Sequence, residues 1–305
     1  MCAIMIKLNM LGGWGLSTKR SGAKRGFWVV LILLGLSLIA LSVLWPQAPE
    51  RAEAFPRGMF EWDEGAAEDP AAAIQLAERL QIGRWYQEFG GYDDAEAFVA
   101  ALREADIEVY ALLGATEWGF EADGASLIAA LREIVAYNRA HPDHPIAGVM
   151  ADIEPYTKAR FKEDREGSMA LYVSGMEKAY GYAKANDLTF ITCIARHYDD
   201  QGLTEGLEKL ILASDEVAVM NYDCGNEVEA IRTEAELCEK HGKRLHCILE
   251  FQEVGKHGLT EDKTYRNKGL DAARAAFESV DGAFPGLHIV WDYHCTEPIR
   301  EMLEE

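Results

Sequence analysis

The sequence predicts a (β/α)8 barrel that follows an N-terminal apolar segment, and three observations support this fold class. Eight short apolar runs alternate with amphipathic helical patterns over about 250 residues. Nearly every run ends in polar and aromatic residues, which is where barrels of this type build their sites. The turn after the first run, "EGAAEDP", carries no glycine-rich phosphate cradle and so disfavours the rival fold, a doubly wound open sheet.

The first element is an uncharged apolar run at residues 27–45. A helix of this length, at ~1.5 Å per residue, roughly crosses a ~30 Å hydrocarbon core. Because Lys19, Arg20, Lys24 and Arg25 precede it, we expect a cytoplasmic segment at 1–26, a transmembrane signal-anchor at 27–46, a linker at 47–56 and an extracytoplasmic barrel at 57–305. The alternative is a signal peptide cleaved after "AEA" at 52–54, which would release a secreted barrel.

Composition limits the classes of partner. The 305 residues are 49% hydrophobic, enough for one large domain with a full core. The formal net charge is −21, and the first 54 residues carry six basic and two acidic side chains, so the remainder carries −25. A field of this sign disfavours nucleic acid as a ligand. The expected partners are a carbohydrate and, through the N-terminal helix, a membrane.

Cysteine and histidine give no clear metal site. The chain beyond the apolar segment has an odd number of cysteines for an exported domain, so at least one should be unpaired. They are Cys193, Cys224, Cys238, Cys247 and Cys295. Cys238, His241, His246 and Cys247 have the composition of a zinc site, but adjacent strand residues 246 and 247 point to opposite faces. We expect neither a metal nor a cofactor.

The eight apolar runs are the expected strands of the barrel. They occupy residues 57–63, 82–89, 107–118, 146–156, 188–200, 216–226, 244–253 and 287–298. Apolar residues recur at three- and four-residue intervals between them, which indicates amphipathic helices. Such patterns include residues 69–80, 94–106, 126–141, 175–186, 204–214 and 269–280. The order of strand and helix is that of a TIM barrel, and no second domain is expected.

The fourth run, "IAGVMADIEPY", ends with two carboxylates. Asp152 and Glu154 have the same strand parity, so both side chains can enter the barrel mouth. Two neighbouring carboxylates resist double ionisation, which raises one pKa and helps to keep a general acid protonated. Asp152 could instead bond backbone amides at a turn, but two carboxylates at an apolar strand end favour a functional role.

This strand resembles the fourth strand of the chitinase-type glycoside hydrolases, family eighteen, which carries D-x-x-D-x-D-x-E. Asp152 and Glu154 match the last two positions, whereas Ala147 and Met150 occupy the first two. The resemblance implies that Glu154 is the general acid and that Asp152 orients the acetamido group of the substrate. It also implies a substrate-assisted mechanism, for which the missing Asp at Met150 is a departure.

Two further strand ends extend the resemblance. The sixth strand of the family carries M-x-Y-D, and "MNYD" at 220–223 matches it, so Tyr222 and Asp223 are expected in the active site. The eighth strand supplies a floor Trp, for which Trp291 is the candidate. A second mechanism stays open, because the large retaining-glycosidase clan has an acid/base Glu on strand four and a nucleophile Glu on strand seven, where this chain has Glu250. Glu250 could alternatively pair with Arg84 or Arg196.

The remaining strand ends offer candidate substrate contacts. Aromatic faces suit the apolar side of a pyranose, although each of these aromatic residues could equally belong to the core. Besides Trp291, the candidates are Glu61, Trp62, Tyr86, Trp118, Asn221 and His197. We therefore expect a membrane-anchored extracytoplasmic glycoside hydrolase that cleaves a cell-wall polysaccharide or an exopolysaccharide. The rival hypothesis is a barrel that binds carbohydrate without cleaving it.

Overall fold

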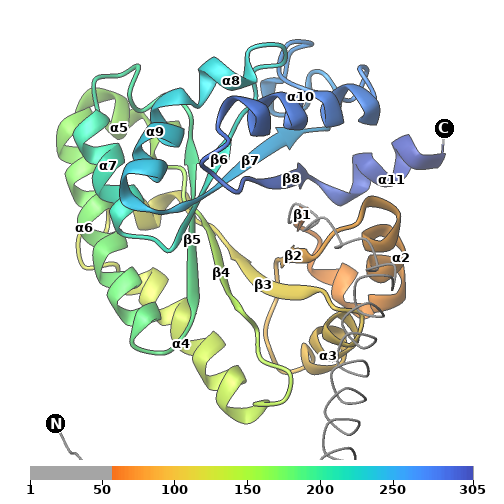
Figure 1. Cartoon of the computed structure of the whole chain (residues 1–305). Coiled ribbons are helices and arrows are strands. Elements are labelled where there is room, and N and C mark those ends of the chain that lie inside the picture. Colours follow the sequence, from red (N-terminus) through yellow and green to blue (C-terminus); the bar gives the residue numbers. More distant parts are fainter. Residues whose placement is uncertain (1–56, 305) are drawn as a thin grey trace, which may run out of the picture. The chain divides into compact units, whose positions relative to one another are not determined.

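The structure is a computed structural model that describes residues 57–304, and its core is a closed barrel of eight parallel strands in the order β1 to β8 (Figure 1). The strands are β1 (Arg57–Glu61), β2 (Arg84–Gln87), β3 (Glu108–Leu113), β4 (Gly148–Asp152), β5 (Thr189–Ala195), β6 (Glu216–Met220), β7 (Arg244–Glu250) and β8 (Val290–His294). Strand β1 pairs with β8 and closes the barrel. The (β/α)8 prediction is confirmed.

Helices follow the strands and surround the barrel (Figure 1). They are α2 (Pro70–Leu80), α3 (Glu96–Glu104), α4 (Ala125–Ala140), α5 (Ala159–Glu163), α6 (Arg165–Lys184), α7 (Thr204–Leu212), α8 (Glu227–Ala230), α9 (Arg232–His241), α10 (Leu270–Ala283) and α11 (Thr296–Glu304). Short 3-10 helices occupy η1 (Glu64–Glu68), η2 (Thr116–Phe120), η3 (Pro155–Thr157) and η4 (Lys256–Gly258). The predicted anchor at 27–46 and linker at 47–56 lie outside the described residues. Within residues 57–304, no helix combines the length and apolarity that a membrane span requires.

Local sequence explains where several helices begin. The Asp69 side chain accepts a hydrogen bond from the Ala72 amide, and Pro70 occupies the first turn, where its missing N–H costs nothing. The Asp164 side chain caps α6 in the same way by accepting from the Gly167 amide. Such caps satisfy amide groups that have no partner within the helix.

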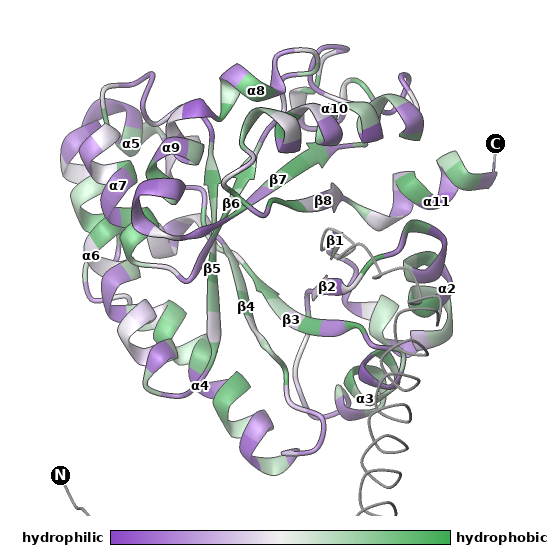
Figure 2. Ribbon diagram, viewed as in Figure 1, coloured by the Kyte–Doolittle hydropathy of each residue, from purple (hydrophilic) through white to green (hydrophobic). Residues whose placement is uncertain are grey.

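Two apolar layers hold the barrel together, and strand parity assigns residues to them. Residues such as Val149 and Ala151 on β4 point outward and pack with the helices in the larger layer. Phe60, Tyr110 and Met150 point inward and fill the barrel interior. The helices carry both hydrophobic and hydrophilic residues, as expected when one face of each helix is buried (Figure 2).

A buried charge network fills the barrel toward the N-terminal ends of the strands. Arg84 Nη1 lies 2.5 Å from Glu216 Oε2, and His246 Nε2 lies 2.7 Å from the same oxygen. His246 Nδ1 lies 2.9 Å from Asp292 Oδ2, and the Tyr86 hydroxyl donates to Asp292 Oδ1 at 3.0 Å. Burial opposes a charge on His246, but Asp292 and Glu216 raise its pKa. The network therefore holds an imidazolium between two carboxylates.

Candidate active site

A cavity of about 1330 Å³ opens at the C-terminal ends of the strands. Seven of the predicted site residues line it: Glu61, Trp62, Asp152, Glu154, His197, Tyr222 and Glu250. A hollow of about 450 Å³ adjoins it and shares Tyr156, Thr157 and His197 with it. The two spaces together are large enough for more than one sugar ring.

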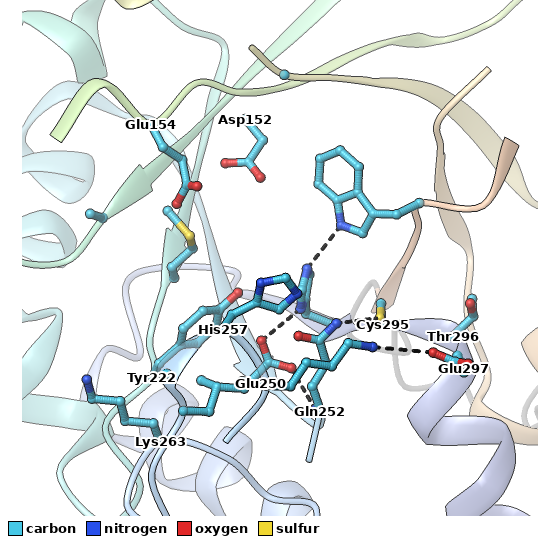
Figure 3. Close-up of a pocket in the computed structure, with 18 of the residues that line it drawn as sticks. Asp152, Glu154, Tyr222, Glu250, Gln252, His257, Lys263, Cys295, Thr296 and Glu297 are labelled. Atoms are coloured by element: carbon cyan, nitrogen blue, oxygen red, sulfur yellow. Dashed lines mark hydrogen bonds and ion pairs between the residues drawn. The ribbon is translucent and has the colours of Figure 1, made fainter. Parts of the chain in front are cut away.

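Strand β4 delivers the carboxylates as its parity predicts. Met150 lies wholly buried in the barrel interior, and the next two residues of the same parity, Asp152 and Glu154, line the cavity above it. Gly114, after β3, makes room for this strand end, since a Cβ there would lie 2.3 Å from the Asp152 carbonyl oxygen. Figure 3 shows the two carboxyl groups side by side at the cavity wall.

Asp152 is poorly solvated for an acid. Its Oδ1 is buried and has no hydrogen-bond partner among the described residues. Burial, and then the nearby charge of Glu154, raise the pKa of Asp152 to about 6, while a hydrogen bond from the Cys193 thiol opposes the shift. The position below it on the strand is the apolar Met150, so no second carboxyl group supports it from there. Asp152 can therefore change protonation state near neutral pH.

Among the described residues, the Glu154 side chain has one hydrogen-bond partner. The Tyr156 hydroxyl donates a hydrogen bond to Glu154 Oε1, which leaves Oε2 for a proton or a substrate atom. Burial and the charge of Glu154 raise the pKa of Tyr156, so its hydroxyl remains a donor. The His197 ring packs edge-on against Tyr156 at 4.8 Å between ring centroids. The general-acid candidate is thus held by its own loop at the cavity wall.

Across the cavity, Glu250 ends a chain of hydrogen bonds (Figure 3). Trp62 Nε1 donates to His294 Nε2 at 3.0 Å, and His294 Nδ1 lies 3.0 Å from Glu250 Oε2. Glu250 Oε1 accepts from the backbone amides of Phe251 and Gln252 at 2.8 and 2.7 Å. The alternative in which Glu250 pairs with Arg84 or Arg196 is wrong, because among residues 57–304 the ionisable partner of Glu250 is His294, whereas Arg84 pairs with Glu216 and Arg196 with Asp223.

Tyr222 lines the same cavity and lies close to His294. It follows β6 with inward parity, and its ring centroid is 6.1 Å from that of His294. Burial, and then the charge of Glu250, raise its pKa, so the hydroxyl stays protonated and can donate to a substrate oxygen. Figure 3 shows its hydroxyl directed into the cavity.

Other predicted residues do not line the cavity, and strand parity gives the reason. The expectation that Trp291 forms the floor is wrong, because this residue faces outward, stacks on Phe277 of α10 at 5.1 Å and donates to Asp281. On β8 the inward positions are Asp292 and His294. Counting the parity back from His294 would have excluded Trp291.

Four further candidates also lie outside the cavity lining. Tyr86 is buried inside the barrel, where it joins the charge network. Trp118 packs against the outer apolar layer. Asn221 is buried with outward parity and donates to the Glu227 carbonyl oxygen. Asp223 lies beside the mouth, where it forms an ion pair with Arg196 at 3.3 Å.

Sequence reasoning missed two functional neighbours and underrated a third. Tyr156 and Gln252 were not predicted, although both lie within two residues of a predicted carboxylate. His294 is not among the predicted site residues, although a histidine at a strand end can contact substrate hydroxyl groups. A signal for it existed, because it is the last inward residue of β8 and therefore meets the end of β7.

The cysteines and the considered zinc cluster have ordinary structural roles. Each of the five cysteines in residues 57–304 is a free thiol. His246 points into the barrel and Cys247 packs in the outer layer, as adjacent strand residues must. In the part of the chain that the structure describes, no group of three metal-ligating side chains is assembled.

Comparison with known proteins places the fold. No family model matches the sequence, and no curated protein matches it. Among solved structures, a GH18 chitinase from Pseudoalteromonas aurantia is similar with a TM-score of 0.55 at 11% identity, over 82% of this chain and 99% of that one. A chitinase from Chromobacterium violaceum gives 0.50 at 13% identity, over 82% and 98%. A class V chitinase mutant from Nicotiana tobaccum, in complex with NAG4, gives 0.51 at 12%, over 78% and 93%. The chain is therefore similar in fold to chitinase barrels along nearly their whole length, with a sequence that diverges widely from theirs.

Proposed function

We propose that this protein is a glycoside hydrolase that cleaves a bond next to an N-acetylated amino sugar, with Glu154 as the general acid. The observation that carries the proposal is the pair at the end of β4: a cavity-lining Glu154 beside Asp152, whose buried oxygen has no partner in residues 57–304 and whose pKa is raised to about 6. The similarity of fold to chitinase barrels supports the same class of substrate.

The chemistry follows from the free atoms of the pair. Glu154 donates its proton to the glycosidic oxygen while the bond from that oxygen to the anomeric carbon breaks. The carbonyl oxygen of the 2-acetamido group attacks the anomeric carbon and forms a cyclic oxazolinium ion. Asp152 accepts the acetamido N–H, which supplies the partner that its buried oxygen lacks. Water then opens the ion and passes a proton to the Glu154 carboxylate, so the configuration is retained.

The size of the site favours an oligosaccharide or polysaccharide over a single sugar. The cavity and the adjoining hollow share Tyr156, Thr157 and His197 in their linings, so they lie side by side, and a chain of sugars that left the cavity here would meet the aromatic pair Tyr156 and His197. One of the similar chitinases was solved with the tetrasaccharide NAG4. We propose a polymer that contains N-acetylglucosamine, of a cell wall or an exopolysaccharide, as the natural substrate.

A non-catalytic carbohydrate-binding barrel is the second candidate, and one observation favours it. The apolar Met150 stands where the chitinase-type signature has a supporting Asp, so the pair lacks one of its usual members. Such a protein would bind sugars through Trp62 and Tyr222 without cleaving them.

Glu154→Gln separates the two candidates. This change keeps shape and hydrogen bonding but removes the transferable proton, so turnover of N-acetylchitotetraose should fall by roughly 10²- to 10⁴-fold with binding retained. The first step on an activated aryl glycoside should suffer much less, because a good leaving group needs little protonation. Exposed Asp143→Asn serves as the matched control. A wild type that binds the tetrasaccharide but releases no reducing ends would support the binding barrel instead.

We also propose that residues 27–46 anchor the protein in the cell membrane with the barrel on the extracytoplasmic side, on the strength of the apolar run and its four upstream basic residues. Protease added to intact spheroplasts should then digest the barrel. Protection of the barrel would contradict this topology, and a mature N-terminus at Phe55 would replace the anchor with a cleaved signal peptide.

A further inference from the structure

We propose that Glu250 and His294 are positioning residues that hold the Trp62 indole as a fixed sugar platform, and that Glu250 is therefore not a nucleophile. The inference rests on the proposed function, because it concerns how the same cavity holds its sugar. Its basis is the chain of hydrogen bonds from Trp62 through His294 to Glu250.

The direction of the proton donors is fixed by chemistry. The Trp62 Nε1–H can only donate, so His294 Nε2 must accept from it. A neutral imidazole that accepts at Nε2 carries its proton on Nδ1, which then donates to Glu250 Oε2. Glu250 is thus the group that selects the tautomer of His294, and this tautomer is the one that can hold the indole.

The contacts and burial of Glu250 suit a residue that positions His294 better than a nucleophile that attacks the anomeric carbon. Its Oε1 accepts from two backbone amides and its Oε2 accepts from His294. Only 3% of the residue is exposed, whereas a nucleophile must reach the anomeric carbon. His294 lies between this carboxylate and Trp62, packed edge-on against Phe60 at 5.6 Å.

Trp62 is the side chain that His294 and Glu250 hold in place, and its position suits contact with a sugar. It lines the same cavity as Asp152 and Glu154, and it is only partly buried. A free indole ring would rotate about two side-chain bonds, so a hydrogen bond to its only polar atom restricts it before a sugar arrives. The inward-facing aromatic platform at the β1–β8 seam is thus Trp62, the residue that follows β1, since Trp291 on β8 faces outward.

Glu250→Gln makes a specific prediction about protons. The Gln side-chain oxygen can still accept from the two backbone amides, which turns its NH2 group toward His294 Nδ1. His294 must then carry its proton on Nε2, where it faces the Trp62 Nε1–H, and two donors cannot bond. Two-bond ¹H–¹⁵N spectra should show the Nδ1–H tautomer of His294 in the wild type and its loss in the variant. An Nε2–H tautomer in the wild type would overturn the proposal.

A double-mutant cycle tests the effect on sugar binding. Affinity for N-acetylchitotetraose is measured by calorimetry in a Glu154→Gln background, which prevents turnover. Glu250→Gln and Trp62→Phe should each weaken binding by about 3- to 10-fold, the worth of one hydrogen bond, and the pair should weaken it no more than either alone. If Glu250→Gln folds poorly, the affinity of Trp62→Phe still measures the contribution of the hydrogen bond between Trp62 and His294. Exposed Glu253→Gln, in the same loop, should leave the affinity unchanged.

The outcomes separate this inference from the proposed function. In the wild-type background, a kcat reduced by on the order of 10⁴-fold by Glu250→Gln, with KM unchanged, would assign the nucleophile role and overturn the positioning role. Additive losses in the cycle would also overturn it. A protein that cleaves nothing but shows the coupled losses in binding would refute the hydrolase and retain the platform. A wild type that does not bind the tetrasaccharide would refute both.

Discussion

Asp152→Asn should stabilise the fold, and the size of the effect should depend on pH. In the folded protein the pKa of Asp152 is raised to about 6 by burial and by Glu154, from 3.8 for a solvated Asp. Between these values the folded state binds more protons than the unfolded state, so stability falls as pH rises through this window. The shift of roughly two pKa units corresponds to about 3 kcal/mol lost above pH 6, at 1.36 kcal/mol per unit. Asn keeps the shape and never ionises, so it avoids this loss.

Urea unfolding at a series of pH values measures the effect. The difference in the free energy of unfolding between Asp152→Asn and the wild type should rise by about 3 kcal/mol between pH 4 and pH 7, then level off. The exposed Asp143→Asn serves as the control, and its difference should stay flat across the same range. A difference for Asp152→Asn that is equally flat would refute the claim that the folded cavity destabilises this carboxylate.

Three further changes test other parts of the structure. Glu216→Gln should lower the free energy of unfolding by about 3–5 kcal/mol in urea titrations, because it leaves Arg84 and the imidazolium of His246 without their shared carboxylate. An unchanged free energy of unfolding would contradict the charge network. Tyr156→Phe should lower kcat by about tenfold, since Glu154 loses its donor, and an unchanged kcat would show that this hydrogen bond has no catalytic role. Trp291→Phe should leave KM for the tetrasaccharide unchanged, because Trp291 packs on Phe277 outside the cavity. A large increase in KM would show that Trp291 contacts the substrate after all.

The barrel could be predicted because its signal is repeated. Eight apolar runs at regular spacing give eight chances to recognise one pattern, so an error in any single run leaves the fold class unchanged. The buried charge network could not be predicted, because Arg84, Glu216 and His246 come from three separate strands and meet only when the barrel closes. From the sequence, each is simply a polar residue near the start of an apolar run.

Site residues could be predicted where their direction depends only on alternation along one strand. They could not be predicted where their position depends on how neighbouring strands are aligned. Asp152 and Glu154 follow Met150 in one strand, so their common direction needs no knowledge of neighbouring strands. Trp291 was chosen by resemblance and by residue type, and a shift of one position would have given an inward residue. The bond between Trp62 and His294 depends on the closure of β1 against β8, which no local pattern reveals.

The chain matches only half of the chitinase-type signature, and the apolar residue in the unmatched half has a physical consequence at Asp152. An Asp at the position of Met150 could share a proton or a hydrogen bond with Asp152, whereas the methionine side chain offers neither. Among residues 57–304, Asp152 therefore keeps a buried oxygen without a hydrogen-bond partner, and burial and then the charge of Glu154 raise its pKa to about 6, so its ionised form is costly. A bound acetamido N–H would supply the missing hydrogen bond and favour the ionised form. Under the proposed function, the N-acetylated sugar takes the place of the absent carboxyl group, so its binding and the ionisation of Asp152 are thermodynamically linked.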